Sequence, residues 1–92
     1  MGKSYEVRLS PAAGKFMEWL AGRDFELFVR LRRALKRLEI DPYAGKPLVG
    51  EGRGMFTLRI GSYRVIYELI KERLVVHIID IGHRRQIYRK LN

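Results

Sequence analysis

The sequence predicts an α+β fold in which an N-terminal pair of helices packs on one face of a small, twisted and mostly antiparallel sheet. The first observation behind this prediction is a change of hydrophobic period, from strand-like to helical near residue 10 and back to strand-like after residue 54. The second is size. A chain of 92 residues with 47% apolar content is sufficient for one core and too small for two, so residues 1–92 are expected to form a single two-layer domain.

The N-terminal half contains one predicted strand and two predicted helices. Tyr5–Leu9 alternates apolar and polar residues, which is typical of a half-buried strand. Ser10 then offers an N-cap, and Pro11 suits the first helical position of a helix that runs to Gly22. A second apolar stripe, from residue 23 to about residue 38, predicts another helix, which Asp41-Pro42 ends. The short connection around Gly22 indicates an antiparallel helical hairpin.

The C-terminal half is predicted to be an ordered loop followed by three strands. Prolines and glycines are frequent between residues 41 and 54, which indicates a loop. Strands are then expected over 55–60, 63–69 and 74–81, with turns at 61–62 and 71–73. The last run is almost continuously apolar and is therefore placed inside the sheet, giving the order βααβββ. Four aromatic residues are assigned to the core, namely Phe16, Trp19, Phe56 and Tyr67, and His77 is expected to be a packed or hydrogen-bonded core residue.

Charge and composition exclude several classes of function. The net charge of +9 indicates a polyanionic partner, either a nucleic acid or an acidic protein, with a membrane surface as the weaker option. There is no cysteine, and the two histidines lie six residues apart, so no metal site is expected. No stretch approaches the ~20 apolar residues of a spanning helix, and residues 1–5 lack the apolar core of a signal peptide. A cytoplasmic protein without a membrane segment is expected.

Side-chain alternation predicts where the polar chemistry lies. Phe56, Leu58 and Ile60 share one face of their strand, so Thr57 and Arg59 point to the other. Arg64 is expected on the same polar face of the next strand. Just beyond the last strand come a histidine, two arginines and a tyrosine: His83, Arg84, Arg85 and Tyr88. Guanidinium groups and a phenol at strand ends can hold a phosphodiester and move its protons, so the pattern indicates RNA chemistry in a cationic cleft.

Four segments, in this order and spacing, carry a resemblance to a known family. They are Leu9-Ser10-Pro11-Ala12-Ala13, the loop from Asp41-Pro42 to Gly45-Lys46-Pro47-Leu48, the strand Gly61-Ser62-Tyr63-Arg64-Val65-Ile66-Tyr67, and the ending Ile81-Gly82-His83-Arg84-Arg85-Gln86-Ile87-Tyr88. With these segments the chain resembles the RelE/ParE toxin superfamily of prokaryotic type II toxin-antitoxin systems, and more closely its RelE-like, ribosome-dependent endoribonuclease branch. The resemblance covers nearly the whole chain.

The resemblance implies a microbial RNase-type fold, cleavage of mRNA in the ribosomal A site, and inhibition by a cognate antitoxin in a possible hetero-oligomer. It also implies that Arg64, Arg84 and Tyr88 are catalytic, that Arg59, Arg85 and Thr57 bind the substrate, and that no metal or cofactor is needed. Well-known RelE members carry two lysines where this chain has Thr57 and Arg59. A lysine can lose its proton and act as a base, whereas an arginine stays charged. The resemblance therefore gives less support to proton abstraction by residues of this strand.

The implied reaction is a transesterification in which the substrate's 2′-hydroxyl attacks phosphorus and leaves a 2′,3′-cyclic phosphate and a 5′-hydroxyl. Tyr88 or His83 is the candidate general base or acid, and the sequence does not assign the direction. Two alternatives stay open. One is a ParE-like inhibitor of DNA gyrase without nuclease activity, and the other is a catalytically inactive domain that binds antitoxin or RNA. In either alternative, the arginines are solvated surface charges and Tyr88 anchors the C-terminal segment to the sheet.

Overall fold

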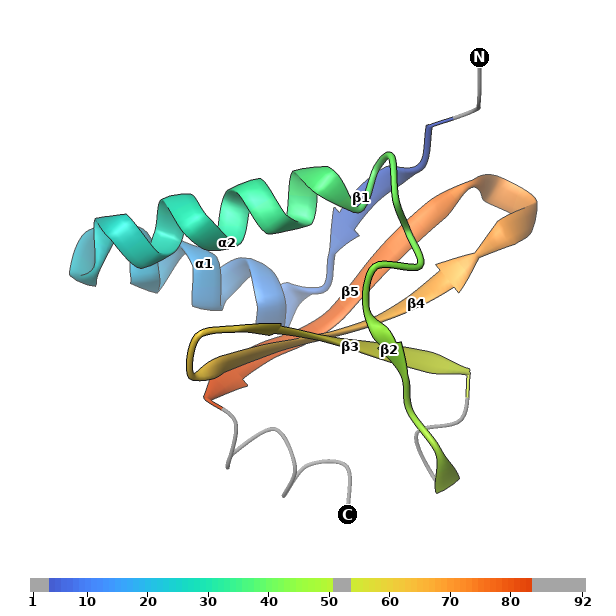
Figure 1. Cartoon of the computed structure of the whole chain (residues 1–92). Coiled ribbons are helices and arrows are strands. Elements are labelled where there is room, and N and C mark those ends of the chain that lie inside the picture. Colours follow the sequence, from blue (N-terminus) through green and yellow to red (C-terminus); the bar gives the residue numbers. More distant parts are fainter. Residues whose placement is uncertain (1–3, 51–53, 84–92) are drawn as a thin grey trace.

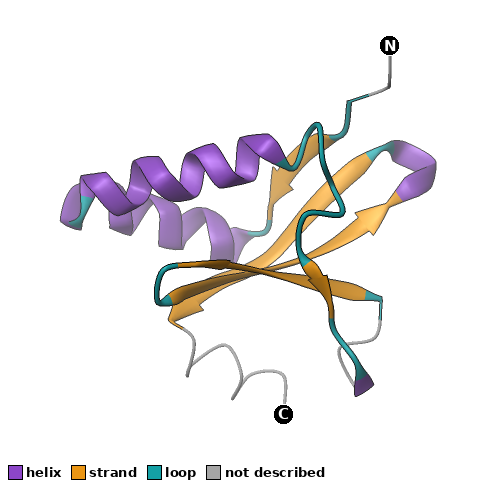
Figure 2. Cartoon of the chain, in the orientation of Figure 1, coloured by secondary structure: helices purple, strands orange, loops and turns teal. Residues whose placement is uncertain are grey.

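Two helices lie side by side on one face of a five-stranded sheet (Figures 1 and 2). The computed structural model describes residues 4–50 and 54–83. The elements follow one another as β1 (Glu6–Leu9), α1 (Pro11–Arg23), α2 (Phe25–Arg37), β2 (Lys46–Pro47), β3 (Met55–Ile60), β4 (Tyr63–Ile70), a 3-10 turn (Lys71–Arg73) and β5 (Val75–His83). The α+β architecture is the one that the sequence predicts.

Side-chain caps define where the helices begin. The Ser10 hydroxyl accepts a hydrogen bond from the Ala13 amide at 3.1 Å and donates one to the Ile79 carbonyl at 2.7 Å, so it both caps α1 and ties it to β5. Asp24 ends α1 and caps α2, because its carboxylate accepts a hydrogen bond from the Leu27 amide at 3.2 Å. The helical hairpin therefore turns at Asp24, two residues after Gly22, where the sequence placed the connection.

The strands lie in the order β1-β5-β4-β3-β2. Only β1 and β5 pair in parallel among the pairs that the structure describes, and the other neighbours are antiparallel. The apolar strand β5 lies between β1 and β4, which confirms its predicted interior position. It continues to His83, two residues beyond the predicted end. A register shift between Ile66 and Tyr67 inserts one extra residue into β5.

The segment predicted as a loop over residues 41–54 contains a short strand, β2, that pairs with β3. A buried tyrosine holds it there. The Tyr67 hydroxyl accepts a hydrogen bond from the Gly45 amide at 2.9 Å and donates one to the Pro42 carbonyl at 2.8 Å. A Cβ on Gly45 would lie 2.7 Å from that hydroxyl, so only glycine fits so close an approach. This strand therefore depends on residues far from it in the chain, and its own glycine- and proline-rich composition predicts only a loop.

The core lies between the helices and the sheet. Leucines of both helices pack against Val65 and Tyr67 of β4 and Val76 and Ile78 of β5, and Phe16 and Phe56 pack against this cluster. Trp19 was predicted to belong to the core and does not, since it is 51% exposed. It lies beside the buried stripe of α1, and the Arg23 guanidinium stands 5.3 Å from its ring centroid. Helical spacing alone does not distinguish the centre of an apolar stripe from its border.

His77 does not lie in the core either. It projects from the face of the sheet opposite the helices, where its side chain is 36% exposed and its Nδ1 lies 3.1 Å from the Glu68 carboxylate. The hydrogen bond agrees with the prediction, and the burial does not. Within residues 4–50 and 54–83, neither helix is long and apolar enough to cross a membrane.

Candidate functional site

The face of the sheet opposite the helices gathers cations from three strands, and we call it the basic sheet face (Lys46, Thr57, Arg59 and Arg64). Arg59 of β3 stands directly opposite Arg64 of β4, and Arg64 stands opposite Gly82 of β5. The residues next to the two arginines along the strands, Leu58 and Val65, pair with each other. Val65 belongs to the core and Leu58 packs against it. Strand alternation thus puts both arginines on the outer face, as the sequence predicts.

The two arginines differ in how they are held. Arg64 is half-buried and its Nε is buried, so its guanidinium is held close to the sheet. Arg59 is exposed, and its Nε donates to the Gly61 carbonyl at 3.4 Å, which directs it toward the β3–β4 turn. Directly opposite residues on antiparallel strands have Cβ atoms about 4.5–5.5 Å apart. Two guanidinium groups at this spacing can contact the same phosphate, which gives this face the chemistry of an anion site.

Lys46 is a third cation on this face, and sequence reasoning missed it. The register places Lys46 of β2 opposite Thr57, which lies two residues before Arg59 and is the next position on the same face of β3. Lys46 is exposed. Its backbone is fixed on both sides, since the Gly45 amide is bound to Tyr67 and the Leu48 amide donates to the Met55 carbonyl at 2.9 Å. The sequence signal was present in the Gly45-Lys46-Pro47-Leu48 motif, but nothing in the loop itself showed that it joins the sheet.

Arg30 is a fourth cation near this site, and it comes from α2. Its Nη atoms lie 3.8 and 3.9 Å from the position that a Cβ on Gly61 would occupy. Arg30 and Arg59 therefore both reach the β3–β4 turn, one from a helix and the other from a strand. In the sequence, Arg30 is one of several arginines along the second helix. Its place beside Gly61 depends on how α2 crosses the sheet, and local sequence patterns do not predict that crossing.

Thr57 lies between these cations. It is 7% exposed, and its hydroxyl has no hydrogen-bond partner within the described part of the chain. A buried hydroxyl without a partner is destabilising by about 1–3 kcal/mol. Because Thr57 lies beside Lys46 and one position from Arg59 on the same face, its hydroxyl is available to a ligand that the cations hold.

His83 lies on the other side of the sheet. It pairs with Tyr63, and the two rings meet edge to face with centroids 5.8 Å apart. Tyr63 in turn contacts Phe16 of α1, with centroids 5.7 Å apart. The structure therefore brings Thr57, Arg59 and Arg64 together and directs the His83 ring toward the helices. The sequence-based expectation that His83 joins the arginines is not what the geometry shows.

The other predicted site residues, Arg84, Arg85 and Tyr88, lie outside the described residues. Their roles remain predictions from the sequence. Within residues 4–50 and 54–83, no cluster of three or more histidine, aspartate or glutamate side chains is arranged to hold a metal ion.

Comparisons with known proteins agree with this fold. A family model described as the ParE toxin of type II toxin-antitoxin system, parDE, matches residues 7–88. Toxin RelG of Mycobacterium tuberculosis is 34% identical over 87 residues, which cover 94% of this chain and 98% of that protein. A chain of the toxin-antitoxin complex RelBE2 from M. tuberculosis matches with a TM-score of 0.75 at 30% identity, over 88% of this chain and 99% of that chain. The isolated E. coli RelE toxin has the same fold, with a TM-score of 0.73 at 22% identity over 95% and 94% of the two chains.

The fold and the basic sheet face, taken with these matches, define the class of protein as a toxin of the RelE/ParE superfamily. More narrowly, the chain belongs to the ParE toxin family of type II toxin-antitoxin systems. The family model carries the ParE name and the M. tuberculosis relative carries the RelE name, so membership alone does not choose between the two branches.

Proposed function

We propose that this toxin is a metal-independent endoribonuclease that cleaves mRNA on the ribosome and is neutralised by a cognate antitoxin in the cytoplasm. The observation that carries the proposal is the pair Arg59 and Arg64, directly opposite each other on the basic sheet face, with Lys46 two rows away on the same face. Fixed cations from three strands match a phosphodiester that gains charge in its transition state.

The chemistry requires no group from outside the chain and the RNA. The 2′-oxygen attacks phosphorus, the bond from phosphorus to the 5′-oxygen breaks, and the products are a 2′,3′-cyclic phosphate and a 5′-hydroxyl. One proton leaves the 2′-hydroxyl and one is delivered to the departing oxygen. Arg64 and Arg59 neutralise the phosphate oxygens, Lys46 holds the adjacent backbone, and Thr57 donates its hydroxyl to the bound RNA.

Proton transfer falls to Tyr88 in this proposal, with Arg84 on the phosphate or the leaving oxygen and Arg85 on the RNA backbone. His83 is the weaker candidate because its ring meets Tyr63 edge to face on the helix side of the sheet. None of Lys46, Thr57, Arg59 and Arg64 is assigned the proton transfer, so correct placement of the mRNA carries more of the rate. Positioning can contribute about 7–11 kcal/mol in favourable cases, which is why we assign the ribosome a role.

The antitoxin is supported by the relatives. The M. tuberculosis RelBE2 structure is a toxin-antitoxin complex, and so are the E. coli RelBE and Staphylococcus aureus YoeB-YefM structures that share this fold. A net charge of +9 favours an acidic inhibitor.

The test is cleavage of a defined mRNA by the purified toxin, with and without translating ribosomes, followed by primer extension and analysis of the product ends. We expect cuts that require ribosomes and leave a 2′,3′-cyclic phosphate. Arg64→Ala should lower the cleavage rate about 100- to 1,000-fold, as loss of a transition-state donor does. Arg32→Ala, which removes the same charge from an exposed site on α2, should leave the rate unchanged. Equal activity of Arg64→Ala and the parent would overturn the proposed site.

The second candidate is inhibition of DNA gyrase, and the ParE family match is the observation that favours it. It is tested in parallel by the supercoiling activity of purified gyrase with increasing toxin. Inhibition of gyrase together with no cleavage of translated mRNA would establish the inhibitor and remove the nuclease.

A further inference from the structure

Strand β5 carries one extra residue, Ile79, where its pairing with β4 shifts between Ile78 and Asp80. In an unbroken strand, Asp80 would share the core-facing side with Ile78. Ile81 takes the next core position instead, at 3% exposure, so Asp80 faces the outer side of the sheet. The bulge therefore directs a carboxylate to the face that carries the two strand arginines.

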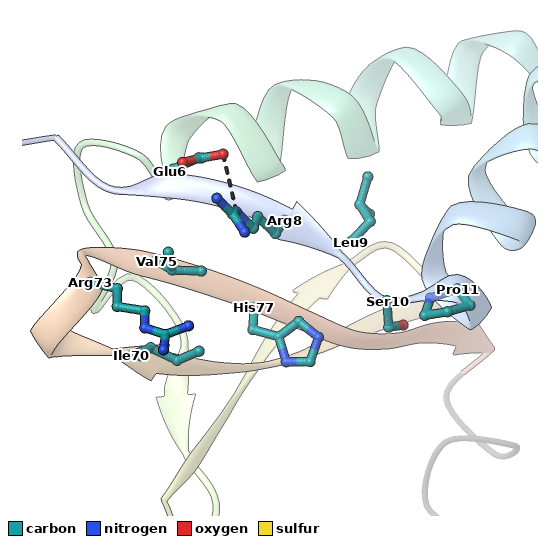
Figure 3. Close-up of a pocket in the computed structure, with 9 residues that line it drawn as sticks. All are labelled: Glu6, Arg8, Leu9, Ser10, Pro11, Ile70, Arg73, Val75 and His77. Atoms are coloured by element: carbon teal, nitrogen blue, oxygen red, sulfur yellow. Dashed lines mark hydrogen bonds and ion pairs between the residues drawn. The ribbon is translucent and has the colours of Figure 1, made fainter.

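Two hydrogen bonds hold this bulge in place. The Ser10 hydroxyl donates to the Ile79 carbonyl at 2.7 Å, and Figure 3 shows Ser10 at the end of β1, beside β5. The Ile81 amide donates to the Asp80 carboxylate at 2.9 Å. This second hydrogen bond also restrains the Asp80 side chain, which is half-buried. Bulges are frequent next to active sites, where they re-aim a side chain, so this one points to a role for Asp80.

Asp80 lies close to the arginines of the basic sheet face. It stands opposite Ile66, and Gly82, two residues further along β5, stands opposite Arg64. Asp80 and Arg64 are therefore diagonal neighbours, which are about 7–8 Å apart in an antiparallel pair. Gly82 contributes no side chain between them. A nucleotide whose phosphate is held by Arg59 and Arg64 can therefore place its ribose over Asp80.

The other carboxylates and the histidine described on this face lie farther from the arginines. Glu68 is four residues from Arg64 along β4, which is about 13 Å in a strand, and its carboxylate lies 3.1 Å from the Nδ1 of His77. His77 lines a separate hollow of about 440 Å³, together with charged side chains of both signs (Figure 3): Glu6, Arg8 and Arg73. Among these described groups, Asp80 is therefore the nearest to the proposed phosphate site.

We propose that Asp80 is the catalytic base of the cleavage reaction. Its carboxylate accepts the proton of the 2′-hydroxyl while the 2′-oxygen forms its bond to phosphorus. The bond from phosphorus to the 5′-oxygen breaks, and Tyr88 donates the proton that this oxygen takes up. Carboxylates act as general bases when they lie within hydrogen-bond reach of the reacting hydroxyl. The inference rests on the nuclease of the proposed function and gives it the proton acceptor that Arg59 and Arg64, which stay charged, do not supply.

Asp80→Asn tests the base, because the asparagine oxygen still accepts a hydrogen bond from the Ile81 amide but does not take up a proton. Single-turnover cleavage of ribosome-bound mRNA should slow about 100- to 10,000-fold, the range of general acid–base catalysis. Binding to ribosomes that carry an uncleavable mRNA, with a 2′-deoxy residue at the cut, should not weaken, since a negative charge near the phosphates is lost. Glu68→Gln is the matched control on the same face and should cleave at the parental rate.

Two comparisons separate a catalytic role of Asp80 from a structural one. Ser10→Ala weakens the same bulge and keeps the carboxylate, so it should lower stability and retain most of the cleavage rate. An mRNA with sulfur in place of the bridging 5′-oxygen has a leaving group that needs no proton. Asp80→Asn should stay slow on this mRNA, whereas Tyr88→Phe should recover, because only the base acts on the 2′-hydroxyl.

Three results would overturn the inference and leave the nuclease intact. They are full cleavage by Asp80→Asn, recovery of Asp80→Asn on the sulfur-containing mRNA, and a loss of rate in Ser10→Ala as large as that in Asp80→Asn. Asp80→Ser, whose hydroxyl also accepts from the Ile81 amide, carries the same predictions if Asp80→Asn does not fold. A parent toxin that cleaves no translated mRNA removes the proposed function, and this inference with it.

Discussion

Lys46 shows how a single residue acquires a role from its register. On its own it is one exposed lysine in a glycine- and proline-rich stretch, and pairing with Thr57 places it beside Arg59 and Arg64. The buried Tyr67 hydroxyl maintains that pairing through Gly45 and Pro42. Three cations are thereby held on a rigid sheet, which requires little reorganisation when an anion binds.

If Lys46 holds RNA, Lys46→Ala should lower the rate of ribosome-dependent cleavage about 10- to 100-fold. A hydrogen bond to a charged group contributes about 1.5–3 kcal/mol, which corresponds to that range. The thermal midpoint should change little, because the side chain is exposed. Lys46→Arg should retain most of the activity, and Lys36→Ala on α2 serves as the matched control. Full activity of Lys46→Ala would remove this residue from the site.

Tyr67 makes stability depend on alkaline pH. Burial raises the pKa of its hydroxyl above the ordinary value of 10, the Gly45 amide opposes this increase, and the charge of Asp41 adds to it. The neutral form is therefore favoured in the folded state. The stability that the buried, neutral hydroxyl contributes is fully present below pH 10. It is lost as the pH rises through the pKa of the folded state, because the unfolded chain releases the proton more readily.

Urea unfolding between pH 8 and pH 11 checks this effect against Tyr67→Phe. The variant should be less stable at pH 8 by about 1–3 kcal/mol, since the Gly45 amide and the Pro42 carbonyl lose their partner. The difference between the two proteins should shrink above about pH 10. A constant difference across this range would show that the Tyr67 hydroxyl does not titrate with unfolding.

At the scale of elements, Ser10 joins three parts of the fold. It follows β1, caps α1 and donates to β5, so one hydroxyl sets the angle at which the helical layer leaves the sheet. Ser10→Ala should reduce the free energy of unfolding by about 1–2 kcal/mol, which is typical for loss of a helix N-cap. Chemical denaturation of this variant beside Ser4→Ala, an exposed serine before β1, measures the effect. Equal stability of the two variants would mean that water replaces both hydrogen bonds.

For the whole molecule, the distribution of charge predicts how RNA binding depends on salt. Each phosphate contact on single-stranded RNA contributes a slope of about −0.7 to the plot of log affinity against log salt concentration. Arg59→Gln should therefore make the slope shallower by about 0.7, while Arg32→Gln on α2 should lower affinity only slightly and keep the slope. Fluorescence anisotropy of a labelled oligonucleotide from about 50 to 200 mM salt gives both slopes. Identical slopes for Arg59→Gln and the parent would place RNA away from this face.

Much of the fold was predictable because its signals are local. The change of period, the Ser10-Pro11 helix start and the apolar run of β5 depend on neighbouring residues, and each produced an element close to its predicted bounds. Alternation likewise placed Arg59 and Arg64 on the outer face. The same kind of reasoning gave a wrong prediction for Trp19, because exposure at the border of an apolar stripe depends on what the rest of the chain covers.

The sequence by itself determined the fold class, the family and the outward direction of the two strand arginines. Only the tertiary structure decided that Lys46 joins the sheet, that Arg30 reaches Gly61, that His83 turns toward the helices, and that β1 is left as an open edge. Each of these depends on register or packing between residues distant in the chain. Such contacts are set by the free energy of the whole core, and no single segment encodes them.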